Sequence, residues 1–119
     1  MHEAKIASLI LQKASKQIEP YTKALKVQNI ELAVGKFRNV DIESLRFAFN
    51  ALRSDFSLLS EAVLDITEVD AHAYCAANLH EYLIDRKNNF ACPFCGSGVG
   101  RVSSGQELEI RKIKLETEE

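Results

Sequence analysis

Two cysteines separated by two residues constrain this chain more than any other feature of its sequence. Cys92 and Cys95 form a Cys-x-x-Cys motif, and Gly96 follows at once. Two thiolates at this spacing can fold back onto one tetrahedral cation, and a glycine suits the turn that follows such a knuckle. A third cysteine, Cys75, lies seventeen residues before Cys92. The pattern predicts a small zinc-stabilised lobe in the second half of the chain.

The cysteine set is one ligand short of a closed structural zinc site. Such a site uses four protein ligands, whereas the chain has only three cysteines. Three residues after Cys75, where a second Cys-x-x-Cys would end, the chain has Asn78, and an amide oxygen is a poor zinc ligand beside thiolates. His72 and His80 lie on either side of this position. Either a histidine completes the site or the site is degenerate.

Length and composition limit the class of protein. A chain of 119 residues, 46% of them hydrophobic, is long enough for one domain or for one domain with a metal-stabilised insert. The net charge of −2 and the lack of a strongly basic run argue against a nucleic-acid partner. No stretch could span a bilayer, and the first apolar run is too short for a signal peptide, so no membrane partner is expected. An odd number of cysteines, two at knuckle spacing, favours reduced thiols in the cytoplasm.

Helical periodicity occurs twice in the chain. Apolar residues recur every three or four positions over residues 6–18, and Pro20 ends that helix. A second helix is predicted after Asp41, which is a residue type suited to a helix N-cap. Its apolar face consists of Ile42, Leu45, Phe49 and Leu52.

Three strands complete the predicted body. The first covers residues 30–34 and ends at Gly35, and the second lies near residues 62–74. The third covers residues 107–115, and the change in its apolar phase near Arg111 predicts a bulge or sharp twist. The predicted fold class is therefore α+β: two helices on a roughly three-stranded sheet, with an inserted zinc-ribbon-like lobe. We expect residues 1–71 and 104–119 to form the α/β domain and residues 72–103 the zinc-binding lobe.

The amino terminus offers a different kind of metal site. The chain starts with Met1, His2 and Glu3. A free terminal amine, the amide nitrogen of His2 and its imidazole can close fused chelate rings in one plane, and Glu3 adds an amide and a carboxylate. Such a planar, nitrogen-rich set suits Ni(II) or Cu(II) better than tetrahedral zinc. On position alone, however, an ordinary frayed terminus is the more common meaning of such a pattern.

Five segments, spread over essentially the whole chain, carry a resemblance to a known family. They are Met1–Glu3, Gly35–Val40, Glu43–Phe49, Cys92–Gly96 and Gly105–Ile110. In this order and spacing they resemble the HypA/HybF family of hydrogenase nickel-incorporation proteins. The combination of an initial Met-His-Glu with a late zinc knuckle is the most distinctive part of the resemblance.

The resemblance implies a small metallochaperone rather than an enzyme, with a nickel-binding α/β domain and a zinc domain. Members pass nickel to the large subunit of [NiFe]-hydrogenase with a partner GTPase, HypB, and in some organisms they also serve urease. Met1, His2 and Glu3 are therefore expected to bind nickel. The expected partners are a HypB-type GTPase, the hydrogenase large subunit and, where urease is served, urease accessory proteins.

The resemblance also bears on the fourth zinc ligand. The family has a second zinc cysteine at the position of Asn78, and some members keep a histidine at the position of His80. The side chain of His80 could reach back to the knuckle, whereas His72 lies in a predicted strand and could face away. We therefore favour His80 over His72. The predicted zinc ligands are Cys75, His80, Cys92 and Cys95.

One further departure from the family, one acidic residue near the expected nickel site and two alternative functions stay open at the level of sequence. Lys36 stands where the family often has Glu, and Asp41 stands where some members place an acidic residue near the nickel. Cys92 and Cys95 could be a redox pair, but a Gly/Ser-rich stretch follows them and Cys75 would be left over. The main alternative function is a zinc-ribbon protein-interaction module that has lost nickel delivery.

Overall fold

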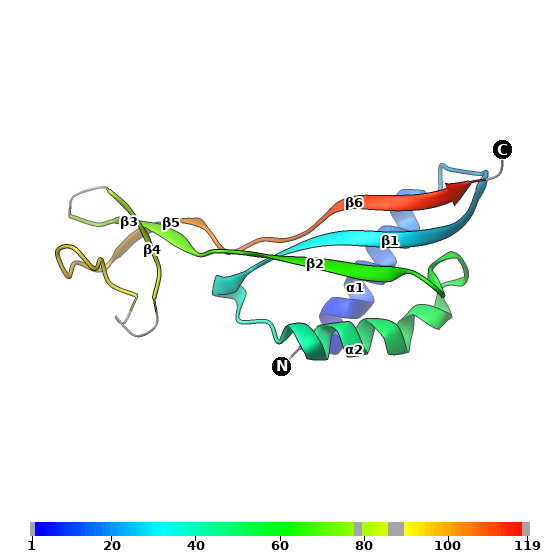
Figure 1. Cartoon of the computed structure of the whole chain (residues 1–119), viewed down its shortest axis with the longest axis horizontal. Helices are drawn as coiled ribbons and strands as arrows, with labels where there is room; N and C mark the ends of the chain where they lie inside the picture. Colours follow the sequence, from blue (N-terminus) through cyan, green and yellow to red (C-terminus); the bar gives the residue numbers. More distant parts are fainter. Residues whose placement is uncertain (1, 78–79, 86–89, 118–119) are drawn as a thin grey trace. The chain divides into compact units, whose positions relative to one another are not determined.

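The computed structural model describes residues 2–77, 80–85 and 90–117, which form two compact units (Figure 1). The first unit, here called the α/β body, consists of Met1–Ala33, Val40–Thr67 and Glu109–Glu119. The second, here called the cysteine lobe, consists of Val34–Asn39 and Glu68–Leu108. These boundaries follow contacts alone, so the division into a nickel-binding and a zinc-binding domain stays a prediction.

Two helices pack against each other in the α/β body. Helix α1 (Glu3–Ile18) starts three residues earlier than predicted, and helix α2 (Ile42–Leu52) has the predicted bounds. Asp41 caps α2 as expected, because its carboxylate accepts a hydrogen bond from the Ser44 amide at 3.1 Å. Short 3₁₀ turns cover Lys36–Arg38, Arg53–Asp55 and Ser57–Leu59. No helix in the described part of the chain is long and apolar enough to cross a membrane.

The predicted three-stranded sheet is confirmed, with the strand order β2-β1-β6 (Figure 1). The strands are β1 (Ala24–Gly35), β2 (Val63–Val69) and β6 (Leu108–Thr117). Strand β1 begins six residues earlier than predicted. In β6 the alternation of burial is interrupted at Arg111 and Lys112, which are both exposed, so the expected change of phase is present. A bulge at this place stays a prediction.

The core of the body lies between the helices and the sheet. Its largest fully buried side chains are Leu11, Val27, Ile30, Leu32, Leu45, Phe49, Leu59 and Leu64. Two arginines tie α2 to the strand beside it (Figure 1). Arg46 donates to the Leu64 carbonyl and Arg53 to the Ala62 carbonyl, each at 2.6 Å. These bonds hold α2 beside β2. The start of α1 lies close to the Asp41 cap, where the Glu3 carboxylate accepts a hydrogen bond from the Asp41 amide.

The prediction of one strand over residues 62–74 is wrong. Strand β2 ends at Val69, and β3 (His72–Cys75) begins after two residues and joins a second sheet. The change of sheet occurs where Gly105, with a φ of 101°, lies against the backbone of Ala71. A side chain at Gly105 would overlap Ala71, so this packing depends on residues more than thirty positions apart. Periodicity along one segment could not reveal it.

The cysteine lobe contains a second three-stranded antiparallel sheet, with the order β4-β3-β5. Strand β4 covers Glu81–Leu83 and β5 covers Val99–Ser104. Strand β5 lies in the small-residue stretch that the sequence analysis did not assign to any element. The lobe has a small core, formed by Ala73, Cys75, Tyr82 and Cys92.

Candidate metal centre

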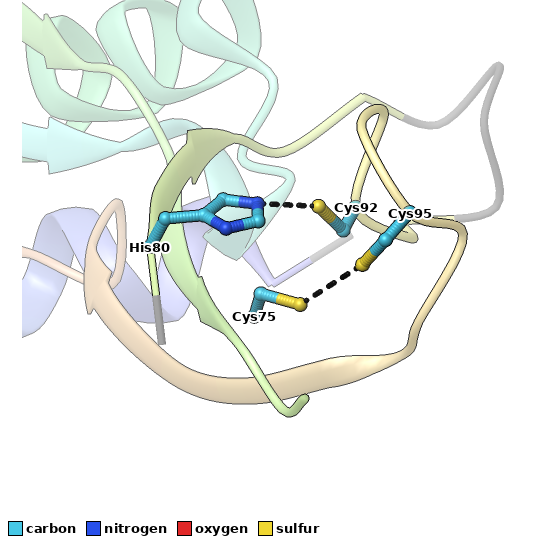
Figure 2. Close-up of side chains that lie close together, drawn as sticks. All are labelled: Cys75, His80, Cys92 and Cys95. Carbon is cyan, nitrogen blue, oxygen red and sulfur yellow. Dashed lines mark hydrogen bonds between the residues drawn. The ribbon is translucent and has the colours of Figure 1, made fainter. Parts of the chain in front are cut away.

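Four side chains of the cysteine lobe point toward one another (Figure 2). They are Cys75, His80, Cys92 and Cys95, and their ligand atoms all lie within 4.8 Å of one another. Sγ of Cys75 is 3.3 Å from Sγ of Cys95, and Nε2 of His80 is 2.8 Å from Sγ of Cys92. All three cysteines are free thiols. The structure thus brings together the four residues predicted as zinc ligands.

The β3–β4 hairpin positions the first two members of the cluster. Cys75 ends β3, and His80 directly precedes β4. The Cys75 amide donates to the His80 carbonyl at 2.8 Å, which extends the antiparallel pairing by one step beyond the Tyr74–Glu81 pair. Because the hairpin closes here, the imidazole of His80 and the thiol of Cys75 reach the same space from neighbouring strands.

The Cys-x-x-Cys knuckle positions the other two members. The Gly96 amide donates to the Cys92 carbonyl, and the Cys92 amide donates to the Ser97 carbonyl, both at 2.8 Å. Gly96 has a φ of 75°, which agrees with the sequence argument that a glycine suits the turn after the knuckle. The exposed Phe94 ring meets the His80 ring edge-on, with 5.2 Å between the centroids. This turn therefore presents both thiols on one side and covers the imidazole with an aromatic ring.

The pKa values of the two knuckle thiols are shifted in opposite directions. Burial raises the pKa of Cys92, partly offset by backbone hydrogen bonds from Phe94 and Cys95. Hydrogen bonds from the side chain and backbone of Ser97 are the main reason that the pKa of Cys95 is lowered to about 6. Ser97 was missed by the sequence analysis. Its signal in the sequence is its place two residues after the second knuckle cysteine, where knuckle backbone and side chains commonly stabilise thiolates.

The donor set fits a zinc ion. Three sulfurs and one imidazole nitrogen are a common ligand set of structural zinc, with Zn–S bonds of about 2.3 Å and Zn–N bonds of about 2.0 Å. A tetrahedral ion with bonds of these lengths holds its donors about 3.5 to 3.8 Å apart, so donor atoms that already lie within 4.8 Å of one another need only small shifts to surround it. Burial of Cys75 and Cys92 shields two of the thiols from water. The site as a whole has the chemistry of a closed structural centre.

The other histidine considered as the fourth ligand is separate from the cluster. His72 is not among the gathered side chains, and its Nδ1 lies 2.9 Å from the Ser104 hydroxyl instead. The reason is strand alternation, which points His72 away from the face that carries Ala73 and Cys75. Asn78 lies outside the described residues.

Two of the predicted nickel residues, His2 and Glu3, lie at the start of α1. His2 is exposed, and its carbonyl accepts the first helical hydrogen bond, from the Ile6 amide at 2.9 Å. Glu3 is 91% buried, and its carboxylate accepts a hydrogen bond from the Asp41 amide at 3.2 Å. Met1 lies outside the described residues. The structure therefore leaves the imidazole of His2 accessible and engages the carboxylate of Glu3.

Asp41 and Lys36, the two other residues that the resemblance singled out, each contact residues of the chain. The Asp41 carboxylate caps α2, and its backbone amide holds Glu3. Lys36 belongs to the cysteine lobe and forms a 2.7 Å ion pair with Asp70. That pair lowers the pKa of Asp70 and raises the pKa of Lys36 through a hydrogen bond and charge attraction.

Comparison with known proteins agrees with this architecture. The hydrogenase maturation factor HypA of Azotobacter vinelandii is 34% identical over 118 residues, which cover 98% of this chain and 100% of that protein. HypA of Desulfatibacillum aliphaticivorans is 36% identical over 115 residues, covering 97% and 87%. Guanidine hydrolase-activating protein A of a Synechocystis species is 30% identical over 114 residues, covering 96% and 94%.

Solved structures share the fold. The solution structure of the Ni metallochaperone HypA from Helicobacter pylori has a TM-score of 0.69 at 19% identity and covers 99% of this chain and 100% of its own. A second solution structure of a HypA protein has a TM-score of 0.72 at 19% identity, covering 99% and 98%. The family model for hydrogenase/urease nickel incorporation, metallochaperone, hypA, matches residues 1–115. The chain therefore belongs to the HypA family of nickel metallochaperones for hydrogenase maturation.

Proposed function

We propose that this chain binds one Ni(II) ion at its amino terminus and delivers it for the maturation of [NiFe]-hydrogenase. The observation that carries the proposal is the exposed imidazole of His2, placed directly before the first helical hydrogen bond of α1. A metal held there is accessible to a protein that takes it over. The protein acts by binding and transfer, without catalytic turnover.

The start of α1 suits a planar nickel complex. The Met1 amine, the His2 amide and the His2 imidazole would supply three nitrogens, and the Glu3 amide a fourth. The helix ladder begins with the bond from Ile6 to His2, so loss of the His2 or Glu3 amide proton breaks no bond of the ladder. The positive end of the helix dipole also favours the negative charge that deprotonated amides carry. Binding at this place is therefore compatible with an intact α1.

The carboxylate of Glu3 has a supporting role in this proposal. It is mostly buried and accepts a hydrogen bond from the Asp41 amide. This contact ties the first turn of α1 to the cap of α2 and orients the residues ahead of it. Glu3 would thus contribute to nickel binding through its backbone nitrogen more than through its side chain.

Cys75, His80, Cys92 and Cys95 would hold a zinc ion permanently. The ion supplies a fixed tetrahedral centre that links the β3–β4 hairpin to the knuckle. It compensates for the small core of the lobe, which four buried side chains form. This zinc is structural and takes no part in nickel transfer.

The proposed partners are a HypB-type GTPase and the hydrogenase large subunit in the cytoplasm, with urease and its accessory proteins as a second route of delivery. One relative is named for the activation of guanidine hydrolase rather than hydrogenase. That relative makes a guanidine hydrolase a third candidate recipient, after hydrogenase and urease.

Equilibrium dialysis of untagged protein against Ni(II), followed by metal analysis, tests the proposal. The expected result is about one nickel per chain for the wild type and none for His2→Ala or for protein with one residue added before Met1. His72→Ala is the matched control and should bind like the wild type. Nickel binding that survives both changes would overturn the proposal. A chain that retains zinc but never binds nickel would instead support the zinc-ribbon interaction module.

A further inference from the structure

The outer face of the lobe sheet carries an arginine with no polar partner. Tyr74 on β3 and Arg101 on β5 lie directly opposite each other in the antiparallel pairing. The guanidinium of Arg101 lies over the Tyr74 ring, with its central carbon 4.8 Å from the ring centroid. The side chain of Arg101 makes no hydrogen bond or ion pair with any residue that the structure describes. The stacking holds the guanidinium in place and leaves its N–H donors available.

A hollow of about 580 Å³ lies beside this pair. Its lining consists of Tyr74, Cys75, Ala76, Gly100 and Arg101. Gly100 keeps the backbones close there, because a Cβ at this position would come within 2.9 Å of the Tyr74 carbonyl oxygen and 3.0 Å of the Ala76 Cα. The hollow thus combines a mainly apolar lining with one cationic group at its edge.

Strand β5 also forms one edge of its sheet. The strand order is β4-β3-β5, so β5 pairs only with β3 among the described strands. An edge strand presents backbone N–H and C=O groups with which an incoming extended segment can pair. The hollow, the arginine and the open edge therefore lie on the same two strands.

We propose that this surface binds an extended acidic segment of a partner protein. A Glu or Asp carboxylate of that segment would accept hydrogen bonds from Arg101, and its main chain would pair with the outer edge of β5. An apolar side chain of the segment would enter the hollow beside Tyr74. The site requires neither the nickel ion nor the amino terminus, so it goes beyond the proposed nickel function.

The charges around Tyr74 favour a peptide over a nucleic acid. Tyrosine and arginine can also stack on bases, but a nucleic acid needs several cations along its backbone. Here the residue paired with Tyr74 on the other side is Glu81, whose carboxylate accepts a hydrogen bond from Ser103 at 2.8 Å. That carboxylate would repel a phosphate chain that crossed the sheet. A single carboxylate bound to Arg101 would lie on the other side of Tyr74 from Glu81, and so would not meet this repulsion.

The test uses full-length zinc-loaded protein and two matched probes. One probe is an acetylated hexapeptide of alternating valine and glutamate, and the other has glutamine at each glutamate. Titrations are followed by ¹H–¹⁵N NMR at low and moderate salt. The glutamate peptide should shift the amide signals of residues 99–104, and its affinity should fall with added salt.

Charge-matched variants decide whether Arg101 is responsible. Arg101→Gln should weaken binding of the glutamate peptide about tenfold, the change expected from losing one charge-assisted hydrogen bond. The glutamine peptide should bind the wild type and Arg101→Gln equally weakly. Arg111→Gln removes an exposed arginine from β6 of the α/β body and should leave the affinity unchanged.

Four results would overturn the proposal. The glutamate peptide could fail to bind, the two peptides could bind equally, Arg111→Gln could weaken binding as much as Arg101→Gln, or the shifted signals could lie outside β5. Tighter binding of an oligouridine probe than of the glutamate peptide would also overturn it, and would assign the surface to single-stranded nucleic acid instead. Zinc content measured for each variant verifies that the lobe is intact.

Discussion

The proposed nickel site at the amino terminus and the candidate zinc site of the cysteine lobe are prepared to different degrees. In the lobe, four donor groups are already gathered within 4.8 Å, and two of them are buried. At the start of α1, His2 is exposed, and its donors would be assembled only around a metal. A buried, preassembled site holds its ion, whereas an exposed and unassembled site can give its ion away. A protein that delivers one metal while a second metal stabilises its fold requires this difference.

The two sites also depend differently on the surrounding fold. The candidate zinc site joins a hairpin to a knuckle, so a bound ion would supplement the small core of the lobe. The proposed terminal site precedes α1, and the apolar face of this helix packs into the hydrophobic core of the body. Loss of metal should therefore unfold the first region and leave the second unchanged.

Removal of zinc should have the largest effect. Cys92→Ser, or a strong chelator at neutral pH, is expected to abolish stoichiometric zinc binding and to unfold the lobe, because its structure depends on the ion. NMR signals of the lobe should collapse to the positions of unfolded chain, while those of α1 and α2 stay dispersed. Ser103→Ala, a surface change in the same lobe, serves as control. A lobe that stays folded without zinc would remove the contrast between the two sites.

Replacement of one histidine should have the next largest effect. His80→Ala is expected to lower zinc affinity by about 100-fold or more, because one of four ligands is lost. His72→Ala should change it little, since its ring contacts Ser104 rather than the cluster. Competition with a zinc chelator measures both. The reverse order of effects would show that the histidines had been assigned the wrong way round.

Ser97→Ala should change how zinc binding depends on pH. The hydrogen bonds from Ser97 keep the pKa of Cys95 near 6, so at pH 7 this thiol is already ionised when zinc arrives. Without the hydroxyl the pKa rises, zinc must displace a proton, and affinity at pH 7 should fall by up to about tenfold. At pH values above the ordinary cysteine range, the two proteins should bind equally. An unchanged pH profile would show that Ser97 does not control Cys95.

Glu3→Gln should have a smaller effect, at the other site. Because the carboxylate is held by the Asp41 amide, its loss is expected to lower nickel affinity by about fivefold at most. Glu43→Gln, which removes an exposed carboxylate near the start of α2, is the control. Nickel binding to each variant is measured by isothermal titration. Complete loss in Glu3→Gln would make the carboxylate a ligand and the terminal site more preassembled than proposed.

Loss of the Lys36–Asp70 ion pair should have the smallest effect. Both side chains are more than half exposed, so Lys36→Ala should lower the thermal midpoint by about 2 °C or less. The pair contributes least at the extremes of pH. Its contribution is lost as pH falls through the lowered pKa of Asp70, and again as pH rises through the raised pKa of Lys36. Thermal unfolding of single and double variants across pH measures it, and a larger shift would mean that the pair stabilises the lobe as zinc does.

Local patterns in the sequence predicted much of the fold. The helix over residues 6–18, the Asp41 cap and the strand before Gly35 depend on neighbours along the chain, and all three are confirmed. The half-buried alternation expected of that strand is wrong, because residues 32–35 are all buried. The start of β1 and the whole of β5 were missed. Most of their residues are polar or small, and they form strands because partner strands distant in sequence pair with them.

The sequence by itself determined that two helices and a sheet carry a Cys-x-x-Cys knuckle and a histidine at position two, because these features depend on residue type and short spacing. Only the tertiary structure decided which histidine joins the cysteines, because that depends on the alternation of β3 and the closure of its hairpin. It also decided that Glu3 meets Asp41 and that Arg101 stacks on Tyr74. Such contacts join residues that local patterns do not connect, since they form only when separate elements pack together.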